Sequence, residues 1–210
     1  SLQQASIGGV YLGFLGALAI WGWIELAFLA GVVAGPMRDD CLPGLSGKAR
    51  FFRAFSTVAH HELLLTLGLV MLVLAGASAA NGMAVATYLI LYLARILAKL
   101  NLFYGVPRIN MEFVPRRLVH LKSYFRRGPV TIVFPAAITV LTALLAVCAE
   151  RLWSAQTDVQ IAGFGLLTAL AALALIEHWL MVIPLPDAKL WRWMLPQQHS
   201  APKNMTKDER

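Results

Sequence analysis

Long apolar runs alternate with polar segments along most of the chain. Five of these runs are long enough to cross a bilayer, which takes about 20 residues of α-helix. We expect membrane-spanning helices at residues 7–34, 55–80, 83–103, 130–153 and 161–183. The pattern therefore predicts an all-α integral membrane protein built as a five-helix transmembrane bundle.

The connection between the third and fourth runs has a pattern of its own. In "GVPRINMEFVPRRLVHLKSYFRRGP", the apolar residues Phe113, Leu118, Leu121 and Phe125 can share one helical face. We predict an amphipathic helix in the membrane interface, which either anchors the chain or docks a partner. The basic residues of this segment that would contact lipid headgroups or that partner are Arg116, Arg117, Lys122, Arg126 and Arg127.

Composition and charge support a membrane location. Of the 210 residues, 59% are hydrophobic and only 14% are charged, which lies outside the range of soluble globular domains. When the 18 Lys and Arg residues are assigned to the two sides of the bilayer, only Arg151, near the end of the fourth run, falls on the side opposite to all the others. The positive-inside rule then places both long basic loops and the C-terminus in the cytoplasm. The net charge of +7 is a topology signal, compatible with anionic lipid, and does not indicate nucleic-acid binding.

The chain shows one domain and few recognisable motifs. We assign residues 1–195 to a transmembrane helical domain and residues 196–210 to a polar cytoplasmic tail, which we expect to be disordered. No repeat period and no GxGxxG, Walker or zinc-ribbon pattern occurs. The paired, Gly- or Pro-broken half-helices that are typical of many transporters are missing as well, so a transporter is disfavoured.

Ionisable residues interrupt four of the five apolar runs at similar depths. At a rise of about 1.5 Å per residue, the ionisable residues of the second and fifth runs lie about 8 to 10 Å inside the cytoplasmic boundary. The ionisable residue of the first run lies about 15 Å inside. The residues are Glu25 in the first run, His61 and Glu62 in the second, Arg95 and Lys99 in the third, and Glu177 and His178 in the fifth.

Such groups should face one another, because a charge at the membrane centre costs about 2.5 to 3.5 kcal/mol. One hypothesis is a structural ion-pair network in which Glu25 and Glu177 pair with Arg95 and Lys99. We predict one common cluster on the cytoplasmic half of the bundle. Its expected members are Glu25, His61, Glu62 and either Glu177 or His178.

The same residue types suit a metal or a tetrapyrrole. Glu and His supply the ligands that iron and zinc accept, and helical bundles hold two irons with inward-facing Glu and His. The bundle motif is Glu-x-x-His, whereas the pairs here are neighbours about 100° apart on a helix, so one member of each pair would point elsewhere. The candidate metal ligands are Glu25, His61, Glu62, Glu177 and His178. Alternatively, His61 or His178 would bind the magnesium of a bacteriochlorophyll or the iron of a haem axially.

Five blocks carry a resemblance when they are taken together. They are "YLGFLGALAIWGWIELAFLAGVVAGP", "HHELLLTL", "AKLNLFYGVPRINMEFVP", "LKSYFRR" and "LIEHWLMVIPLPDAKLWRWML". In this order they resemble the PuhE-type proteins of anoxygenic phototrophic bacteria, which are described as photosynthetic complex assembly proteins. That family carries further hydrophobic sequence before the first block, so we expect an N-terminal part to be absent here. Its often polar residue before the first glutamate is Ile24 in this chain, which weakens a metal site that needs it.

The resemblance implies a role but no mechanism. It implies an integral factor of the bacterial inner, intracytoplasmic membrane that helps assemble the reaction centre and antenna or supplies their pigment. The implied partners are membrane lipids and either reaction-centre and antenna subunits or enzymes of the bacteriochlorophyll pathway. The alternative is an enzyme: a membrane subunit of a bacteriochlorophyll-biosynthesis step, such as the oxygen-dependent cyclase, with a Glu/His metal site.

Overall fold

The computed structural model describes residues 6–76 and 82–183. Within these residues the chain forms five α-helices that are long and apolar enough to cross a membrane, which confirms the predicted all-α transmembrane bundle. They are α1 (Ile7–Leu29), α2 (Gly47–Gly76), α3 (Met83–Tyr104), α4 (Val133–Trp153) and α5 (Asp158–Leu180). The predicted tail at 196–210 lies outside the described residues.

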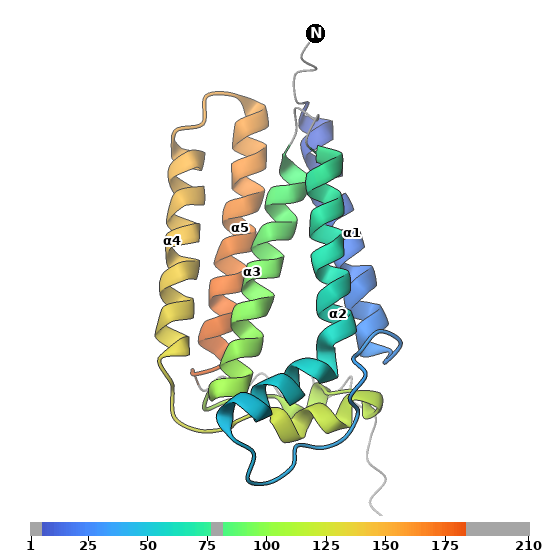
Figure 1. Cartoon of the computed structure of the whole chain (residues 1–210). Coiled ribbons are helices and arrows are strands. Elements are labelled where there is room, and N and C mark those ends of the chain that lie inside the picture. The colour runs from blue at the N-terminus through green and yellow to red at the C-terminus, as the bar shows by residue number, and fades with distance from the viewer. Residues whose placement is uncertain (1–5, 77–81, 184–210) are drawn as a thin grey trace, which may run out of the picture.

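Helix α3 is the central element of the bundle. It contacts all four other long helices, while α4 packs on α5, and α1 packs on both α2 and α5. Figure 1 shows α4 and α5 as an antiparallel pair on one side of α3, with α1 and α2 on the other. A larger share of α3 is buried than of any other span. Charged side chains on α3 are therefore well placed to find protein partners.

The outward faces of the helices are apolar. Leu12 and Leu26 on α1 are 75% and 67% exposed, and Leu74 on α2 is 67% exposed. An exposed apolar surface of this size is unfavourable in water and indicates contact with a membrane or with another protein. For spans of this length, the covering medium is lipid.

Helix α1 ends at Leu29, five residues before the predicted end of its span. The cause is Gly31, whose φ of 70° lies in the left-handed region that glycine adopts without strain. The Gly31 N–H donates to the carbonyl of Phe28 and the Val32 N–H to that of Ala27. This pair of hydrogen bonds is a Schellman motif, and it directs the chain out of the helix.

Helix α2 begins at Gly47, eight residues before the predicted start of its span. In Figure 1 its first turns lie across one end of the bundle before the helix bends into it. At the bend, the N–H of Met37 donates to the carbonyl of Ser56, and the N–H of His61 donates to the carbonyl of Ala34. A backbone inserted into the helical ladder is a recognised cause of kinks. The connection 30–46 therefore fixes where His61 sits.

Gly35 allows this insertion. A Cβ built at this position would lie 1.9 Å from the carbonyl oxygen of Ser56 and 2.5 Å from the carbonyl carbon of Thr57. Both are backbone atoms, so no side-chain rotation could relieve the clash. The close packing of residue 35 on α2 requires glycine.

The amphipathic segment between α3 and α4 is present as two short 3-10 helices, Met111–Phe113 and Arg116–Tyr124, with a non-helical break at Leu118. Leu118 and Leu121 are buried against Phe28 and Ala34, as the apolar face predicts. The side chain of Phe113 lies outside the described part. Tertiary contacts lie on both sides of the break: Arg117 donates to the Ala30 carbonyl, and Ser123 accepts from the N–H of Cys41.

Both long connections, 30–46 and 105–132, lie at the same end of the bundle (Figure 1), which we call the loop end. The predicted basic residues of the second connection gather there. Arg116, Arg117, Arg126 and Arg127 are exposed, and Lys122 is half-buried. Arg127 also donates to the carbonyl of Pro107.

Candidate functional site

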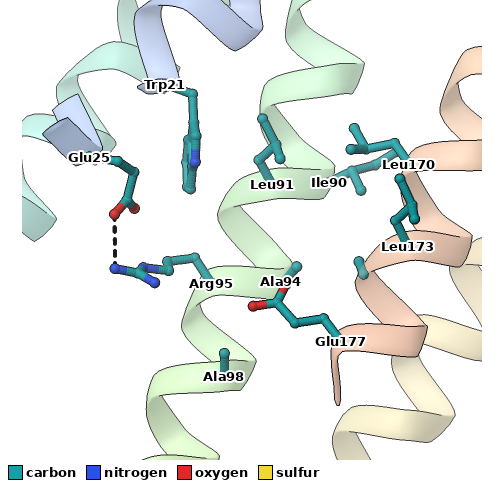
Figure 2. Close-up of a pocket in the computed structure, with 11 residues that line it drawn as sticks. Trp21, Glu25, Ile90, Leu91, Ala94, Arg95, Ala98, Leu170, Leu173 and Glu177 are labelled. Carbon is teal, nitrogen blue, oxygen red and sulfur yellow. Dashed lines mark hydrogen bonds and ion pairs between the residues drawn. The ribbon is translucent and has the colours of Figure 1, made fainter. Parts of the chain in front are cut away.

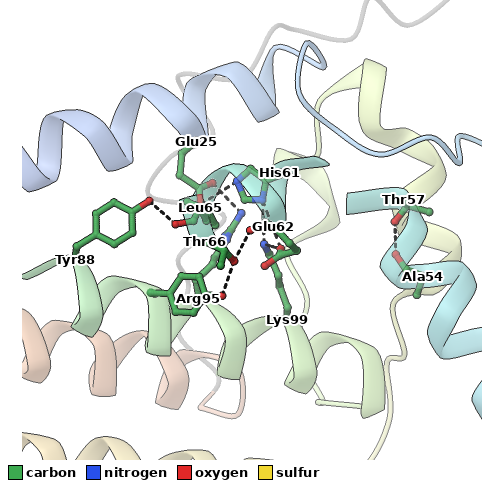
Figure 3. Close-up of polar contacts among 11 residues, drawn as sticks. Glu25, Ala54, Thr57, His61, Glu62, Leu65, Thr66, Tyr88, Arg95 and Lys99 are labelled. Atoms are coloured by element: carbon green, nitrogen blue, oxygen red, sulfur yellow. Dashed lines mark hydrogen bonds and ion pairs between the residues drawn. The ribbon is translucent and has the colours of Figure 1, made fainter. Parts of the chain in front are cut away.

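Five of the predicted residues meet between α1, α2 and α3 (Figure 3). Helix α1 supplies Glu25, α2 supplies His61 and Glu62, and α3 supplies Arg95 and Lys99, which lie one turn apart. We call these five residues the ion-pair network. Its members come from three helices because an apolar span can carry a charge only where another helix provides a partner.

Each carboxylate of the network is paired with a cation. Arg95 Nη2 lies 2.9 Å from Glu25 Oε2, and Lys99 Nζ donates to Glu62 Oε1. The side chains of Glu25 and Glu62 are only 18% and 15% exposed. The two Glu, one Arg and one Lys carry no net charge when His61 is neutral, which limits the cost of placing them inside the bundle.

His61 lies at the centre of the network and is fully buried. Its Nε2 is 3.5 Å from Glu25 Oε1, and its Nδ1 is 3.5 Å from Glu62 Oε1 and 3.2 Å from Lys99 Nζ. The ring also packs on Phe28, with 4.3 Å between the ring centroids. The imidazole thus joins the Glu25 pair to the Glu62 pair.

The neighbours of His61 determine its tautomer. An ammonium group can only donate hydrogen bonds, so Nδ1 of His61 accepts from Lys99 and the proton of the neutral ring lies on Nε2. That N–H faces Glu25 Oε1 across 3.5 Å, and neither atom forms a hydrogen bond among the described residues. Lys99 therefore donates to His61, whereas His61 and Glu25 face each other without a formed hydrogen bond. In this arrangement Nε2 has no free lone pair for a metal.

Glu177 lies across a cavity from the network. The cavity has a volume of about 340 Å³ between α1, α3 and α5, and Glu177 lines it together with Glu25 and Arg95. We call it the α1–α3–α5 cavity. Figure 2 shows the Glu25–Arg95 pair on one side and Glu177 on the other. Glu177 is exposed, and it has no hydrogen-bond or ion-pair partner within residues 6–76 and 82–183.

His178 does not join the network. It is fully buried, does not line the α1–α3–α5 cavity, and donates from Nδ1 to the carbonyl of Ala174 at 2.8 Å. Its Nε2 is then an acceptor, and it has no partner in the described part of the chain. Neighbouring residues point about 100° apart on a helix, which separates His178 from Glu177.

The described residues contain no group of three or more His, Cys, Asp or Glu side chains arranged to hold a metal ion. Arg95 and Lys99 already pair with Glu25 and Glu62, and the proton of the neutral His61 ring lies on Nε2. Iron, zinc or tetrapyrrole binding by Glu25, His61, Glu62, Glu177 or His178 remains a prediction.

A second, larger cavity lies on the other side of the network. Its volume is about 840 Å³, between α2, α3 and residues 109–125, and we call it the α2–α3 cavity. Most of its lining is apolar. The polar side chains that line its inner part are Glu62, Thr66, Tyr92, Arg95 and Lys99. Arg95 lines both cavities, so the network forms the partition between them.

Two of these residues were not predicted from the sequence. Tyr92 and Thr66 hydrogen-bond at 2.9 Å, and the hydroxyl of Thr66 donates to the carbonyl of Glu62 at 2.8 Å. Thr66 lies four residues after Glu62, and Tyr92 lies three residues before Arg95, so each shares a helix face with a network residue. That spacing is the sequence signal that could have revealed them.

Arg50 is a further polar residue whose role sequence reasoning missed. It lies in the first turns of α2, where Nη2 donates to the carbonyl of Tyr124 at 2.6 Å and Nη1 to that of Phe103 at 3.3 Å. Its guanidinium also stacks over the Phe103 ring, 4.2 Å from the centroid. Arg50 thereby ties the start of α2 to the end of α3 and to the amphipathic segment.

Comparison with known proteins places this architecture in a family. Residues 1–202 match the family model described as "Protein of unknown function (DUF3623)". An "Uncharacterized 30.4 kDa protein in puhA 5′ region" of Rhodobacter capsulatus is 50% identical over 196 residues, which cover 93% of this chain and 72% of that protein. No solved structure matches the chain. The five-helix protein described above, with its buried ion-pair network, belongs to the DUF3623 family.

Proposed function

We propose that this protein is a PuhE-type factor for building the bacterial photosynthetic apparatus. The observation that carries the proposal is the 50% identity to a Rhodobacter capsulatus protein whose name places it in the puhA 5′ region, a photosynthesis gene region. The five sequence blocks that resemble PuhE-type proteins support the same role. The spans and the basic loop end suit a multi-pass protein of the inner membrane with its loops in the cytoplasm.

The geometry favours a structural or binding role over a catalytic one. In the network, both carboxylates and both cations are engaged with one another, and the imidazole proton is directed at a carboxylate. Such an arrangement fixes three helices relative to one another. It also gives a large, mostly apolar cavity one polar wall, which suits the binding of a membrane-soluble component or the docking of a partner helix.

A second candidate is a membrane subunit of a bacteriochlorophyll-pathway enzyme that binds a metal or a tetrapyrrole. Two observations favour it. Glu25 Oε1 and His61 Nε2 face each other at 3.5 Å, a spacing that two ligands of one ion can adopt when each bond is about 2.1 Å long, and the ion would displace the proton from Nε2. His178 has the tautomer of a metal ligand, because its Nδ1 donates to a backbone carbonyl and leaves Nε2 as the ligating atom.

Deletion of the gene tests the proposal and separates the two candidates. An assembly factor predicts reduced levels of reaction centre and antenna, with pigment synthesis that proceeds to its end product. An enzyme subunit predicts that a pathway intermediate accumulates. Unchanged complexes and unchanged pigment would overturn both.

Metal analysis and an absorption spectrum of the purified protein test the site directly. Stoichiometric iron or zinc without a visible band would support the Glu/His metal site, and a chlorin or haem band would support axial ligation by His61 or His178. If neither is found, the ion-pair network is the full account of Glu25, His61 and Glu62.

A further inference from the structure

We propose that the α2–α3 cavity binds a membrane-soluble ring molecule that carries a neutral carbonyl group. This proposal rests on the volume and lining of the cavity. It goes beyond the proposed function because it names a class of ligand. The volume of about 840 Å³ lies in the upper part of the range of about 300–1,000 Å³ that is typical of ligand sites.

The walls of the cavity suit a planar ring. Aromatic side chains reach it from several elements: Phe28 from α1, Phe51 from α2, Phe103 from α3 and Phe125 from the amphipathic segment. Aromatic rings pack against planar ligands by stacking and by edge-to-face contacts. Acyl chains alone would not need several aromatic side chains around one cavity.

The cavity is bordered by residues that face the membrane. Leu29, Phe55 and Leu63 line it and are 44%, 48% and 58% exposed. These three residues lie on α1 and α2, which form membrane spans. An apolar molecule could therefore enter from the bilayer without passing through water.

The inner wall offers hydrogen-bond donors. Lys99 has three N–H groups, and two of them face Glu62 Oε1 and His61 Nδ1. Arg95 has five N–H donors. Among the described residues its side chain pairs with Glu25 alone, and it is 31% exposed. Donors with spare capacity on the wall of an apolar cavity are suited to an acceptor oxygen on the ligand.

The charge balance indicates that this acceptor is neutral. Each cation of the network already has a carboxylate partner, so a phosphate or a free carboxylate would bring an uncompensated charge into the bundle at a high desolvation cost. A ketone, ester or quinone carbonyl accepts the same hydrogen bonds without that cost. Two kinds of molecule share this chemistry: isoprenoid quinones and esterified chlorophyll-type pigments.

The test measures which molecules the purified full chain retains. The protein in detergent is incubated with one of three probes: decylubiquinone, bacteriochlorophyll a, or dodecylbenzene, which has a ring and a tail but no carbonyl. Bound probe is quantified after gel filtration. We expect at least one carbonyl-bearing probe to bind about tenfold or more tighter than dodecylbenzene, because a hydrogen bond from a charged donor contributes on that scale.

The identity of the retained probe distinguishes the two sources. Preference for decylubiquinone assigns a quinone, and preference for bacteriochlorophyll a assigns a pigment. Equal retention of all three probes, or recovery of phospholipid alone, would overturn the inference. The proposed function is judged separately by the deletion strain, so either can fail without the other.

A matched pair of variants locates the binding. Ala59 lines the cavity without belonging to the network, so Ala59→Phe should fill part of the volume and weaken retention by about tenfold or more. Ala146→Phe adds the same ring to an exposed position on α4 and should leave retention unchanged. If Ala59→Phe elutes as a folded monodisperse protein and binds as tightly as the parent chain, the ligand does not occupy this cavity.

Discussion

Lys99 Nζ on α3 lies 3.2 Å from His61 Nδ1 on α2. This contact joins two helices and also places the imidazole proton on Nε2, because the lysine can only donate. The Glu25–Arg95 pair and the Glu62–Lys99 pair are thereby linked through one ring. Substitutions in one pair should therefore affect the other.

Breaking one ion pair should destabilise the bundle more than removing both partners. Arg95→Met leaves the carboxylate of Glu25 without its cation. We expect the free energy of unfolding to fall by about 2 kcal/mol. This value lies between about 1 kcal/mol for an exposed pair and about 3–5 kcal/mol for a buried pair that loses one partner. The double variant Glu25→Gln/Arg95→Met should recover much of this loss. Thermal unfolding in detergent measures it, and strictly additive effects would show that the two side chains do not interact.

Gly35→Ala should disrupt the bend in α2. The new Cβ would overlap the backbone at Ser56, and overpacking that side chains cannot relieve costs at least about 1–3 kcal/mol. We expect a clear fall in the unfolding temperature. Gly22→Ala is the control, because a Cβ at position 22 of α1 meets nothing within 4 Å and should be neutral or slightly stabilising. Similar behaviour of the two variants would show that residue 35 is not tightly packed on α2.

His120 should make stability depend on pH. Burial lowers the pKa of this histidine from its ordinary 6.5, Arg38 adds to the effect, and Asp40 and Asp39 oppose it. The unfolded chain therefore binds this proton more readily, so stability falls as the pH drops through about 6.5 and levels off below the folded pKa. Unfolding temperatures between pH 8 and pH 5 should fall further for the parent chain than for His120→Gln. Parallel curves would assign the pH dependence to other groups.

Labelling of cysteines should establish the orientation in the membrane. Cys41 lies in the 30–46 connection at the loop end, and Ser154 lies exposed in the turn between α4 and α5. In chains with Cys148→Ala, a membrane-impermeant maleimide added outside intact cells should label Ser154→Cys in a Cys41→Ser background. In a chain that keeps Cys41 and Ser154, the same maleimide should label Cys41 only after the membrane is permeabilised. The reverse result would invert the predicted topology.

The sequence was sufficient to locate the helices and the core of the site. Apolar length located the five spans, and the cost of lone charges in lipid brought Glu25, His61, Glu62, Arg95 and Lys99 together. Depth alone could not show that Glu177 and His178 lie outside the network, because helix residues at one depth face different directions.

The early start and the bend of α2 could not be predicted from local pattern. The start at Gly47 lies in a polar, basic stretch before the apolar run that marked the span. The bend depends on backbone contacts with the 30–46 connection, which is far from it in the sequence. The α2–α3 cavity was missed for the same reason, since its floor is formed by the transverse first turns of α2 and by the amphipathic segment. Only the spacing of Thr66 and Tyr92 from network residues could have indicated its polar wall.

The hydrogen bond from the His61 N–H to the Ala34 carbonyl ties the bend of α2 to the 30–46 connection. In a straight helix that N–H would donate to the carbonyl of Thr57, so straightening exchanges one backbone bond for another of the same kind. Because the backbone of His61 is held by that bond and its imidazole contacts Lys99 and Glu25, the position of the 30–46 connection and the geometry of the ion-pair network depend on each other.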